Sequence, residues 1–221
     1  MTRLRTLLPL VVIPALVACA EPEIERPMGE DAIAIGDSVL EWNLEEGASI
    51  PEVFAEQSGL AITHAAISGT RVLGGEDSIP SQYVSGEWQV VLIDGGANDV
   101  GPDGCGCGDC VEVVDELVSE DLATGAMVEL VDRVLADSAE VILLGYYRPA
   151  ADSEFGACDE ELVAVNTRYA ALAAAREGVT FVDMGEAIDY PSDPSDFSED
   201  GIHPSVAGSR AVGEYIATQW P

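Results

Sequence analysis

The chain has 221 residues, of which 41 are acidic and nine are basic, so its formal net charge at pH 7 is −32. This length supplies one domain with a substantial hydrophobic core, and two full domains are not expected. A field this negative repels nucleic acid and anionic membrane surfaces, which excludes nucleic acid as a partner. It also keeps the protein soluble at high salt, where screening weakens the repulsion among its own carboxylates.

The first 30 residues are not expected to belong to the folded domain. Two arginines precede an almost entirely apolar run over residues 7–17, which is the pattern of a signal peptide covering residues 1–18. The run is shorter than the ~20 residues that a membrane-spanning helix needs. It ends in the letters LVAC, which resemble the lipobox of bacterial lipoproteins, whose cysteine is lipidated. We therefore expect a lipid anchor on Cys19, a short polar tether over residues 19–30, and a location on the periplasmic side of the cell envelope. If Cys19 is not lipidated, the protein is secreted.

Short apolar runs, most of them rich in β-branched residues, alternate with helical patterns along the rest of the chain. The expected strands cover residues 32–35, 60–65, 90–94, 141–145 and 179–183. The helical patterns cover residues 39–58 with a break near Gly47 and Pro51, then 111–136, 159–176, and 205–219 with Ser205 near the N-cap. This alternation predicts a parallel sheet between two helix layers, a three-layer α/β/α domain over residues 31–221.

Polar residues follow the expected strands. The segments after them are residues 36–38, 67–71, 95–99, 146–148 and, beyond a loop, 200–204. Ligands of open parallel sheets bind outside the carboxyl ends of the strands, so these segments are expected to meet at one edge.

The residue types at that edge suit acyl transfer. The hydroxyl of Ser38 is a weak nucleophile at neutral pH and needs a base, for which His203 is the candidate. Asp200 lies three residues before His203 and can accept from its Nδ1–H. An oxyanion needs preorganised donors, and the main-chain N–H groups of Ser38 and Gly69 and the amide of Asn98 are available. The competing interpretation of Ser38 is a helix N-cap, which the same position also allows.

Four sequence blocks resemble those of the SGNH (GDSL-type) esterase and lipase superfamily. They are GDS at residues 36–38, SG at 68–69, GAND at 96–99 and DGIHPS at 200–205, in the order of the family. Any one block alone is weak evidence for the family. Together the four blocks span nearly the whole domain and are strong evidence. The one small departure is Val39, which stands where the family name has leucine.

The resemblance implies both a fold and a set of roles. The fold is a flavodoxin-like α/β/α sandwich with a five-stranded parallel sheet. Ser38 is the nucleophile, Asp200 and His203 are the acid–base pair, and Ser38, Gly69 and Asn98 are the oxyanion donors. No cofactor and no metal are expected.

Other polar and aromatic residues near the blocks are interpreted structurally. Asp37 and Asp99 are expected to bond loop amides, and His64, inside the second strand, to be a satisfied structural histidine. Arg71 is expected in a surface ion pair. Trp42 lies four residues after Ser38, on the same face of a helix, and could form the floor of an acyl pocket or belong to the core.

Four cysteines remain after Cys19, namely Cys105, Cys107, Cys110 and Cys158. Two of them have the spacing C-x-x-C, which could ligate zinc, but an oxidising compartment favours disulfides. The strands before the two cysteine loops are neighbours in a flavodoxin-like order. We therefore expect Cys158 to bond one member of the cluster and the other two to bond each other. Cys110 is expected in the local bond, because a Cys105–Cys107 bridge would close a very tight loop.

These observations predict an extracytoplasmic serine esterase acting on a small-molecule or glycan ester through an acyl-enzyme. A carbohydrate O-deacetylase or an acyltransferase on the same triad is the first alternative. A non-catalytic binding lipoprotein of the envelope is the second.

Overall fold

The computed structural model describes residues 31–220. The expected signal peptide at residues 1–18, the tether at 19–30 with Cys19, and the final Pro221 lie outside the described residues. No helix within residues 31–220 is both long and apolar enough to cross a membrane.

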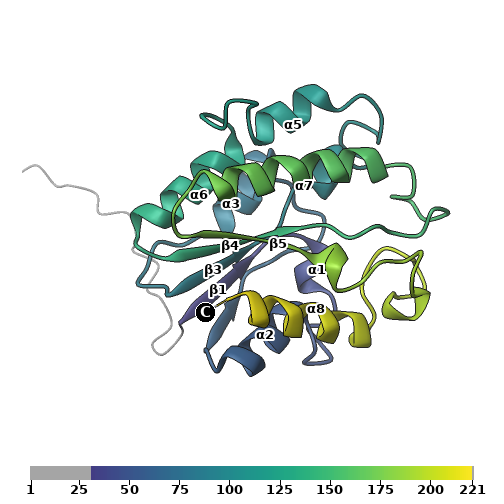
Figure 1. Cartoon of the computed structure of the whole chain (residues 1–221), viewed down its shortest axis with the longest axis horizontal. Helices are drawn as coiled ribbons and strands as arrows, with labels where there is room; N and C mark the ends of the chain where they lie inside the picture. Colours follow the sequence, from purple (N-terminus) through teal and green to yellow (C-terminus); the bar gives the residue numbers. More distant parts are fainter. Residues whose placement is uncertain (1–30, 221) are drawn as a thin grey trace, which may run out of the picture.

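A five-stranded sheet forms the middle layer, with all strands parallel and in the order β2-β1-β3-β4-β5 (Figure 1). The strands are β1 Ala32–Ile35, β2 Ile62–His64, β3 Val90–Ile93, β4 Glu140–Gly145 and β5 Val179–Asp183. Every residue of β1 and β3 is buried, as helix layers on both faces require. The predicted strands and the flavodoxin-like order are confirmed, although β2 is shorter than expected.

Helices cover both faces of this sheet (Figure 1). On one face α2 (Ile50–Ser58) packs against α8 (Val206–Gln219). On the other face α6 (Ala126–Ala136) and α7 (Asp159–Ala174) contact β4, and α5 (Val111–Leu117) lies outside α7. The three-layer α/β/α architecture is therefore confirmed.

Short helices occupy the loops. The one-turn helices α1 (Ser38–Glu41) and α4 (Ala97–Val100) follow β1 and β3 directly. The others are α3 Ile79–Gln82 and the 3-10 turns η1 Gly75–Asp77, η2 Met184–Glu186 and η3 Pro194–Asp196. Because α1 and α4 follow adjacent strands, they bring the GDS and GAND blocks side by side.

The helical pattern over residues 111–136 is not one helix, and that prediction is wrong. The chain leaves α5 at Val118 in an extended conformation and returns to helix only after Gly125, whose φ is 130°. A Cβ at Gly125 would lie 2.4 Å from the carbonyl oxygen of Leu117, so this close approach requires glycine. Ser119 and Asp121 bond the amides of the intervening turn. The apolar spacing continues across the break because both helices face the same core.

The helix expected over residues 39–58 breaks near Gly47, as predicted, but Pro51 is not at the break. Pro51 lies in the first turn of α2, where an amide N–H would have no helical partner. Ser49 caps this helix with a capping box to Glu52. The expected N-cap at Ser205 of α8 is confirmed, because its side chain accepts from Gly208 N at 3.2 Å.

Candidate active site

Ser38 is the first residue of α1, directly beyond the carboxyl end of the central strand β1. The prediction that Ser38 itself is the N-cap is wrong. Asp37 is the N-cap, and its Oδ1 accepts from Val39 N at 2.9 Å. The hydroxyl of Ser38 is therefore not used in capping and is free to make another contact.

Three predicted residues meet in a hydrogen-bonded line. His203 Nε2 lies 2.8 Å from Ser38 Oγ, and His203 Nδ1 lies 2.7 Å from Asp200 Oδ2. Ser38 and His203 are 165 positions apart in the chain, so only the fold brings them together. The imidazole side chain is 16% exposed, which lets a substrate reach it from one side.

The charge on Asp200 decides which nitrogen of His203 holds the proton. Burial alone would raise the pKa of Asp200, but hydrogen bonds from the His203 ring and from the amides of Ile202 and His203 outweigh it and lower that pKa. An ionised carboxylate can only accept, so Nδ1 of a neutral His203 carries the proton. Nε2 is then left as an acceptor for the hydroxyl of Ser38, the arrangement that a general base needs.

The predicted oxyanion donors lie around the same hydroxyl. Ser38, Gly69 and Asn98 line one hollow together with His203. Gly69 has φ 77°, a left-handed conformation that favours glycine, and a Cβ there would meet no atom within 4 Å. Asn98 Nδ2 donates one hydrogen to Thr70 O at 2.9 Å, which orients the amide and leaves its second hydrogen free.

Two buried carboxyl groups lie beneath Ser38. Asp37 N donates to Asp94 Oδ1 at 2.8 Å, and Asp37 Oδ2 accepts from Tyr146 Oη at 2.8 Å. Burial raises the pKa of Asp37, and burial together with the charge of Asp37 raises the pKa of Asp94 well above its usual range. Oδ2 of Asp94 is buried without a hydrogen-bond partner.

The structural roles expected of three polar residues are largely confirmed. Asp37 and Asp99 bond loop amides, the latter accepting from Val72 N at 3.0 Å and Leu73 N at 2.9 Å. His64 Nε2 lies 2.9 Å from Leu40 O. Burial raises the pKa of Asp99 despite these bonds.

Sequence reasoning missed Gln82, a residue of α3. Its Oε1 accepts from Gly36 N at 2.7 Å, and its Nε2 donates to Gly36 O at 2.9 Å and to Thr70 Oγ1 at 3.1 Å. Gln82 thus joins the turn before Ser38 to the loop of Gly69. A lone glutamine in a short helix carries no local signal of this role.

Two further expectations turn out differently. Trp42 neither lines the hollow around Ser38 nor belongs to the buried core, and instead stacks on the ring of His203.

The prediction that Arg71 forms an ion pair is wrong, because its guanidinium donates to the main-chain carbonyl of Asp103. None of the ion pairs within residues 31–220 includes Arg71. The loop of residues 101–106 lies beside Arg71, so the carbonyl of Asp103 accepts the hydrogen bond in place of a carboxylate.

The hollow at the triad is small, about 160 Å³. Its remaining walls are largely apolar and aromatic, and consist of Asp37, Val39, Ala97, Tyr146, Tyr147, Pro149, Glu154, Phe155, Leu162 and Ile202. A second hollow of about 170 Å³ shares Gly69, Asn98, Glu154 and Phe155 with it and adds polar groups that include Arg71 and Asp103. A larger hollow, about 670 Å³, lies between α5 and α7 and contains none of Ser38, Asp200 and His203, so we place the chemistry in the small one.

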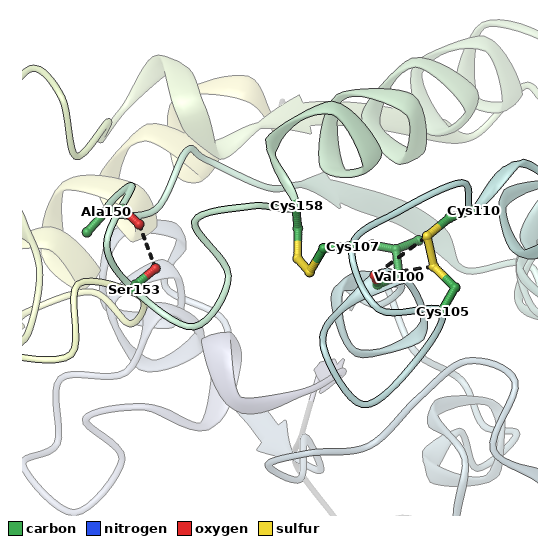
Figure 2. The surroundings of a disulfide bond; sticks show 7 residues. All are labelled: Val100, Cys105, Cys107, Cys110, Ala150, Ser153 and Cys158. Atoms are coloured by element: carbon green, nitrogen blue, oxygen red, sulfur yellow. Dashed lines mark hydrogen bonds between the residues drawn. A yellow bond between two sulfur atoms is a disulfide. The ribbon is translucent and has the colours of Figure 1, made fainter.

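Two disulfides pin the loops at one wall of the site. Cys105 bonds Cys110, and Cys107 bonds Cys158 at the start of α7 (Figure 2). This confirms a local bond through Cys110 and a long-range bond to Cys158. The second bond ties the loop after α4 to the loop of residues 149–158, which supplies Phe155 to both hollows. Within residues 31–220, no group of three or more His, Cys, Asp or Glu side chains could hold a metal ion.

Solved structures share this fold at low sequence identity. A Streptococcus pneumonia protein proposed to be a platelet activating factor is 22% identical with a TM-score of 0.62, covering 86% of this chain and 83% of its own. A GDSL-like lipase from Bacteroides thetaiotaomicron is 18% identical with a TM-score of 0.59, covering 85% of each chain. A family two carbohydrate esterase from Clostridium thermocellum, solved with cellohexaose, is 18% identical with a TM-score of 0.59, covering 88% of this chain and 64% of its own.

No curated protein sequence matches this chain. Residues 34–211, however, match the GDSL-like lipase/acylhydrolase family, and this range contains all four blocks and every strand of the sheet except the first two residues of β1. The chain therefore belongs to the GDSL-like lipase/acylhydrolase family of ester-hydrolysing enzymes.

Proposed function

We propose that the protein is a serine esterase that hydrolyses esters of short acyl groups through an acyl-enzyme on Ser38. His203 takes the hydroxyl proton as Ser38 attacks the ester carbonyl, and Asp200 holds the imidazole in the required tautomer. The amides of Ser38, Gly69 and Asn98 receive the oxyanion. His203 then returns the proton to the leaving alcohol and activates the water that releases the acid. The single observation that carries this proposal is the line of 2.8 Å and 2.7 Å contacts from Ser38 through His203 to Asp200.

The preference for short acyl groups is inferred from the size of the apolar hollow. Its volume of about 160 Å³ is close to that of an engineered ~150 Å³ cavity that takes up benzene. We therefore expect acyl groups of up to about six carbons to fit, and longer chains to be left in water.

The test is turnover of p-nitrophenyl esters of increasing chain length. We expect kcat/KM to be highest for acyl groups of two to about six carbons and to fall for longer ones. Ser38→Ala is expected to lower kcat by about 10⁴-fold or more, whereas Ser58→Ala, at the far end of α2, is the matched control and keeps full activity. A fluorophosphonate should label Ser38 of the wild type. Absence of both labelling and turnover would reject the serine mechanism, and a maximum at long chains would reject the short-acyl preference.

The polar second hollow favours one further candidate, a carbohydrate O-deacetylase. It adjoins the oxyanion donors and contains Arg71, Asp103 and Glu154 beside the ring of Phe155. Charged groups and one aromatic ring suit an alcohol rich in hydroxyl groups. Acetate release from acetylated cellobiose should then fall in Arg71→Ala while turnover of p-nitrophenyl acetate is unchanged. This candidate would be rejected if Arg71→Ala lost the same fraction of its turnover on both substrates, or lost turnover on neither.

Lipid anchoring on Cys19 and a location on the periplasmic side of the envelope remain proposals that rest on the sequence of residues 1–19. Metabolic labelling with a radioactive fatty acid tests them, with Cys19→Ala as the control. A wild-type protein that takes up no label would reject the anchor.

A further inference from the structure

Trp42 contacts both segments that carry the triad. As the C-cap of α1, its main-chain N–H donates to Ser38 O at 2.9 Å. Its indole ring stacks on the imidazole of His203, with centroids 3.9 Å apart and planes inclined by 8°. Its Nε1–H donates to Ser198 Oγ at 3.0 Å. Trp42 thus connects the turn of the nucleophile to the loop of the base.

The loop side of this contact is itself closely tied to His203. Ser198 N donates to His203 O at 2.8 Å, and Ser198 Oγ donates to Pro204 O at 3.1 Å. The indole therefore contacts His203 on its ring face and, through Ser198, along its main chain. A tryptophan that only filled the core would be surrounded by apolar side chains, whereas Trp42 is half-buried and faces a polar ring.

We propose that Trp42 is a positioning residue for His203, fixing the plane of the imidazole and favouring the charged ring that forms during the reaction. This inference rests on the proposed function, because it requires His203 to act as the base. When Ser38 Oγ bonds to the ester carbon, its proton moves to Nε2, and the carbonyl electron pair moves to the oxygen. The ring becomes an imidazolium, whose Nδ1–H stays hydrogen-bonded to the carboxylate of Asp200. The face of an indole is its negative side, so it attracts the imidazolium more strongly than the neutral ring.

Other titratable groups also face His203, and the experiment has to keep them constant. Two carboxyl groups act on it, Asp200 by direct contact and Asp37 through its field. The other titratable side chains lining the same hollow are Tyr146, Tyr147 and Glu154. Burial raises the pKa of both tyrosines well above their usual range, so they are uncharged. All of these groups remain when only Trp42 is replaced.

The experiment compares Trp42→Leu, which removes the ring face, with Trp42→Phe, which keeps a ring face but lacks the Nε1 donor. With p-nitrophenyl acetate we expect Trp42→Leu to lower kcat about tenfold with little change in KM. The acidic limb of its kcat/KM profile should move to lower pH, because the charged ring is less favoured. Trp42→Phe should keep most of the wild-type kcat, and the acidic limb of its profile should stay close to that of the wild type. Trp220→Leu is the matched control, because Trp220 meets Phe54 edge-on at 5.9 Å and lies away from the triad.

The proposal is overturned if Trp42→Leu keeps the wild-type kcat and the wild-type acidic limb of the kcat/KM profile. It is also overturned if kcat falls as far in Trp42→Phe as in Trp42→Leu. If Trp42→Leu does not fold, the wild type still decides the matter by NMR, because the chain has only two histidines. The ring current of a stacked indole should move the Hε1 resonance of His203 upfield of that of His64, and two unshifted resonances would refute the stacking. Failure of the proposed function would be recognised separately, as absence of turnover in the wild type.

Discussion

The two sides of the active site are held in place by different forces. The cysteine wall, residues 98–110 with 149–158, is crossed by two disulfides and supplies Asn98 and Phe155. The acid–base loop, residues 197–205, contains no cysteine and carries Asp200 and His203.

Hydrogen bonds hold the acid–base loop. Asp200 Oδ1 accepts from Ile202 N at 2.9 Å and His203 N at 3.0 Å, and Tyr147 Oη donates to Ile202 O at 2.9 Å. The backbone pairs Phe197 with Pro204. The residues proposed to transfer protons are thus oriented by hydrogen bonds, whereas the wall that shapes the hollow is restrained covalently. The difference suggests that activity and stability can be separated by substitution, one side at a time.

The largest expected effect on activity comes from the acid–base loop. Asp200→Asn keeps an oxygen for the two amides but places N–H groups where Nδ1–H of His203 must donate, which disfavours the required tautomer. We expect kcat on p-nitrophenyl acetate to fall by about 10³- to 10⁴-fold. The free energy of unfolding at pH 7, measured by chemical denaturation, should fall by only about 1 kcal/mol, because Asp200 is partly exposed. A large loss of stability with intact kcat would break the comparison.

The cysteine wall should show the reverse pattern. The Cys107–Cys158 bond closes a loop with a sequence separation of 51, and Cys105–Cys110 one of 5. Chain entropy predicts that replacing both cysteines of the longer bond by serine lowers the free energy of unfolding by about 4 kcal/mol, against about 2 kcal/mol for the shorter bond. We expect kcat on p-nitrophenyl acetate to change less than about twofold in either pair, since neither bond touches the triad. Urea unfolding and steady-state kinetics measure both quantities, and a fall in kcat matching that of Asp200→Asn would contradict the separation.

The smallest expected effect concerns Asp94, which lies beneath both sides of the site. Its raised pKa means that the folded chain keeps a proton that the unfolded chain loses above about pH 4. Wild-type stability is therefore lost as pH rises from about 4 toward the folded pKa. Asp94→Asn keeps an acceptor for Asp37 N and cannot ionise. We expect the variant to gain about 1 kcal/mol relative to the wild type between pH 5 and pH 8, in denaturation series at the two pH values. A difference that stays constant or shrinks over this range would show that Asp94 is ionised in the fold.

Much of the fold and the site could be predicted because the relevant signals are local. A run such as AIAI at residues 32–35 predicts a buried strand, and the polar residues after it then lie at the edge of the sheet. The break at residues 118–125 could not be predicted, because α5 and α6 present their apolar positions to one core and the spacing continues across the turn. The N-cap was predicted at Ser38 instead of Asp37 for a related reason. Both residue types cap helices equally well, and only the tertiary contact from Tyr146 Oη to Asp37 Oδ2 shows which side chain points inward.

The sequence by itself determined the strand order of the family, the residues that reach the carboxyl edge and the presence of a local and a long-range disulfide. The strand order follows from the resemblance of the four blocks to the family, the residues at the edge follow from the periodicity, and the disulfides follow from the cysteine spacing together with that strand order. Only the tertiary structure decided that Trp42 stacks on His203, that Gln82 joins two turns and that Phe155 bounds both hollows. These contacts join segments far apart in the chain through single side chains, and a single side chain leaves no pattern in the sequence.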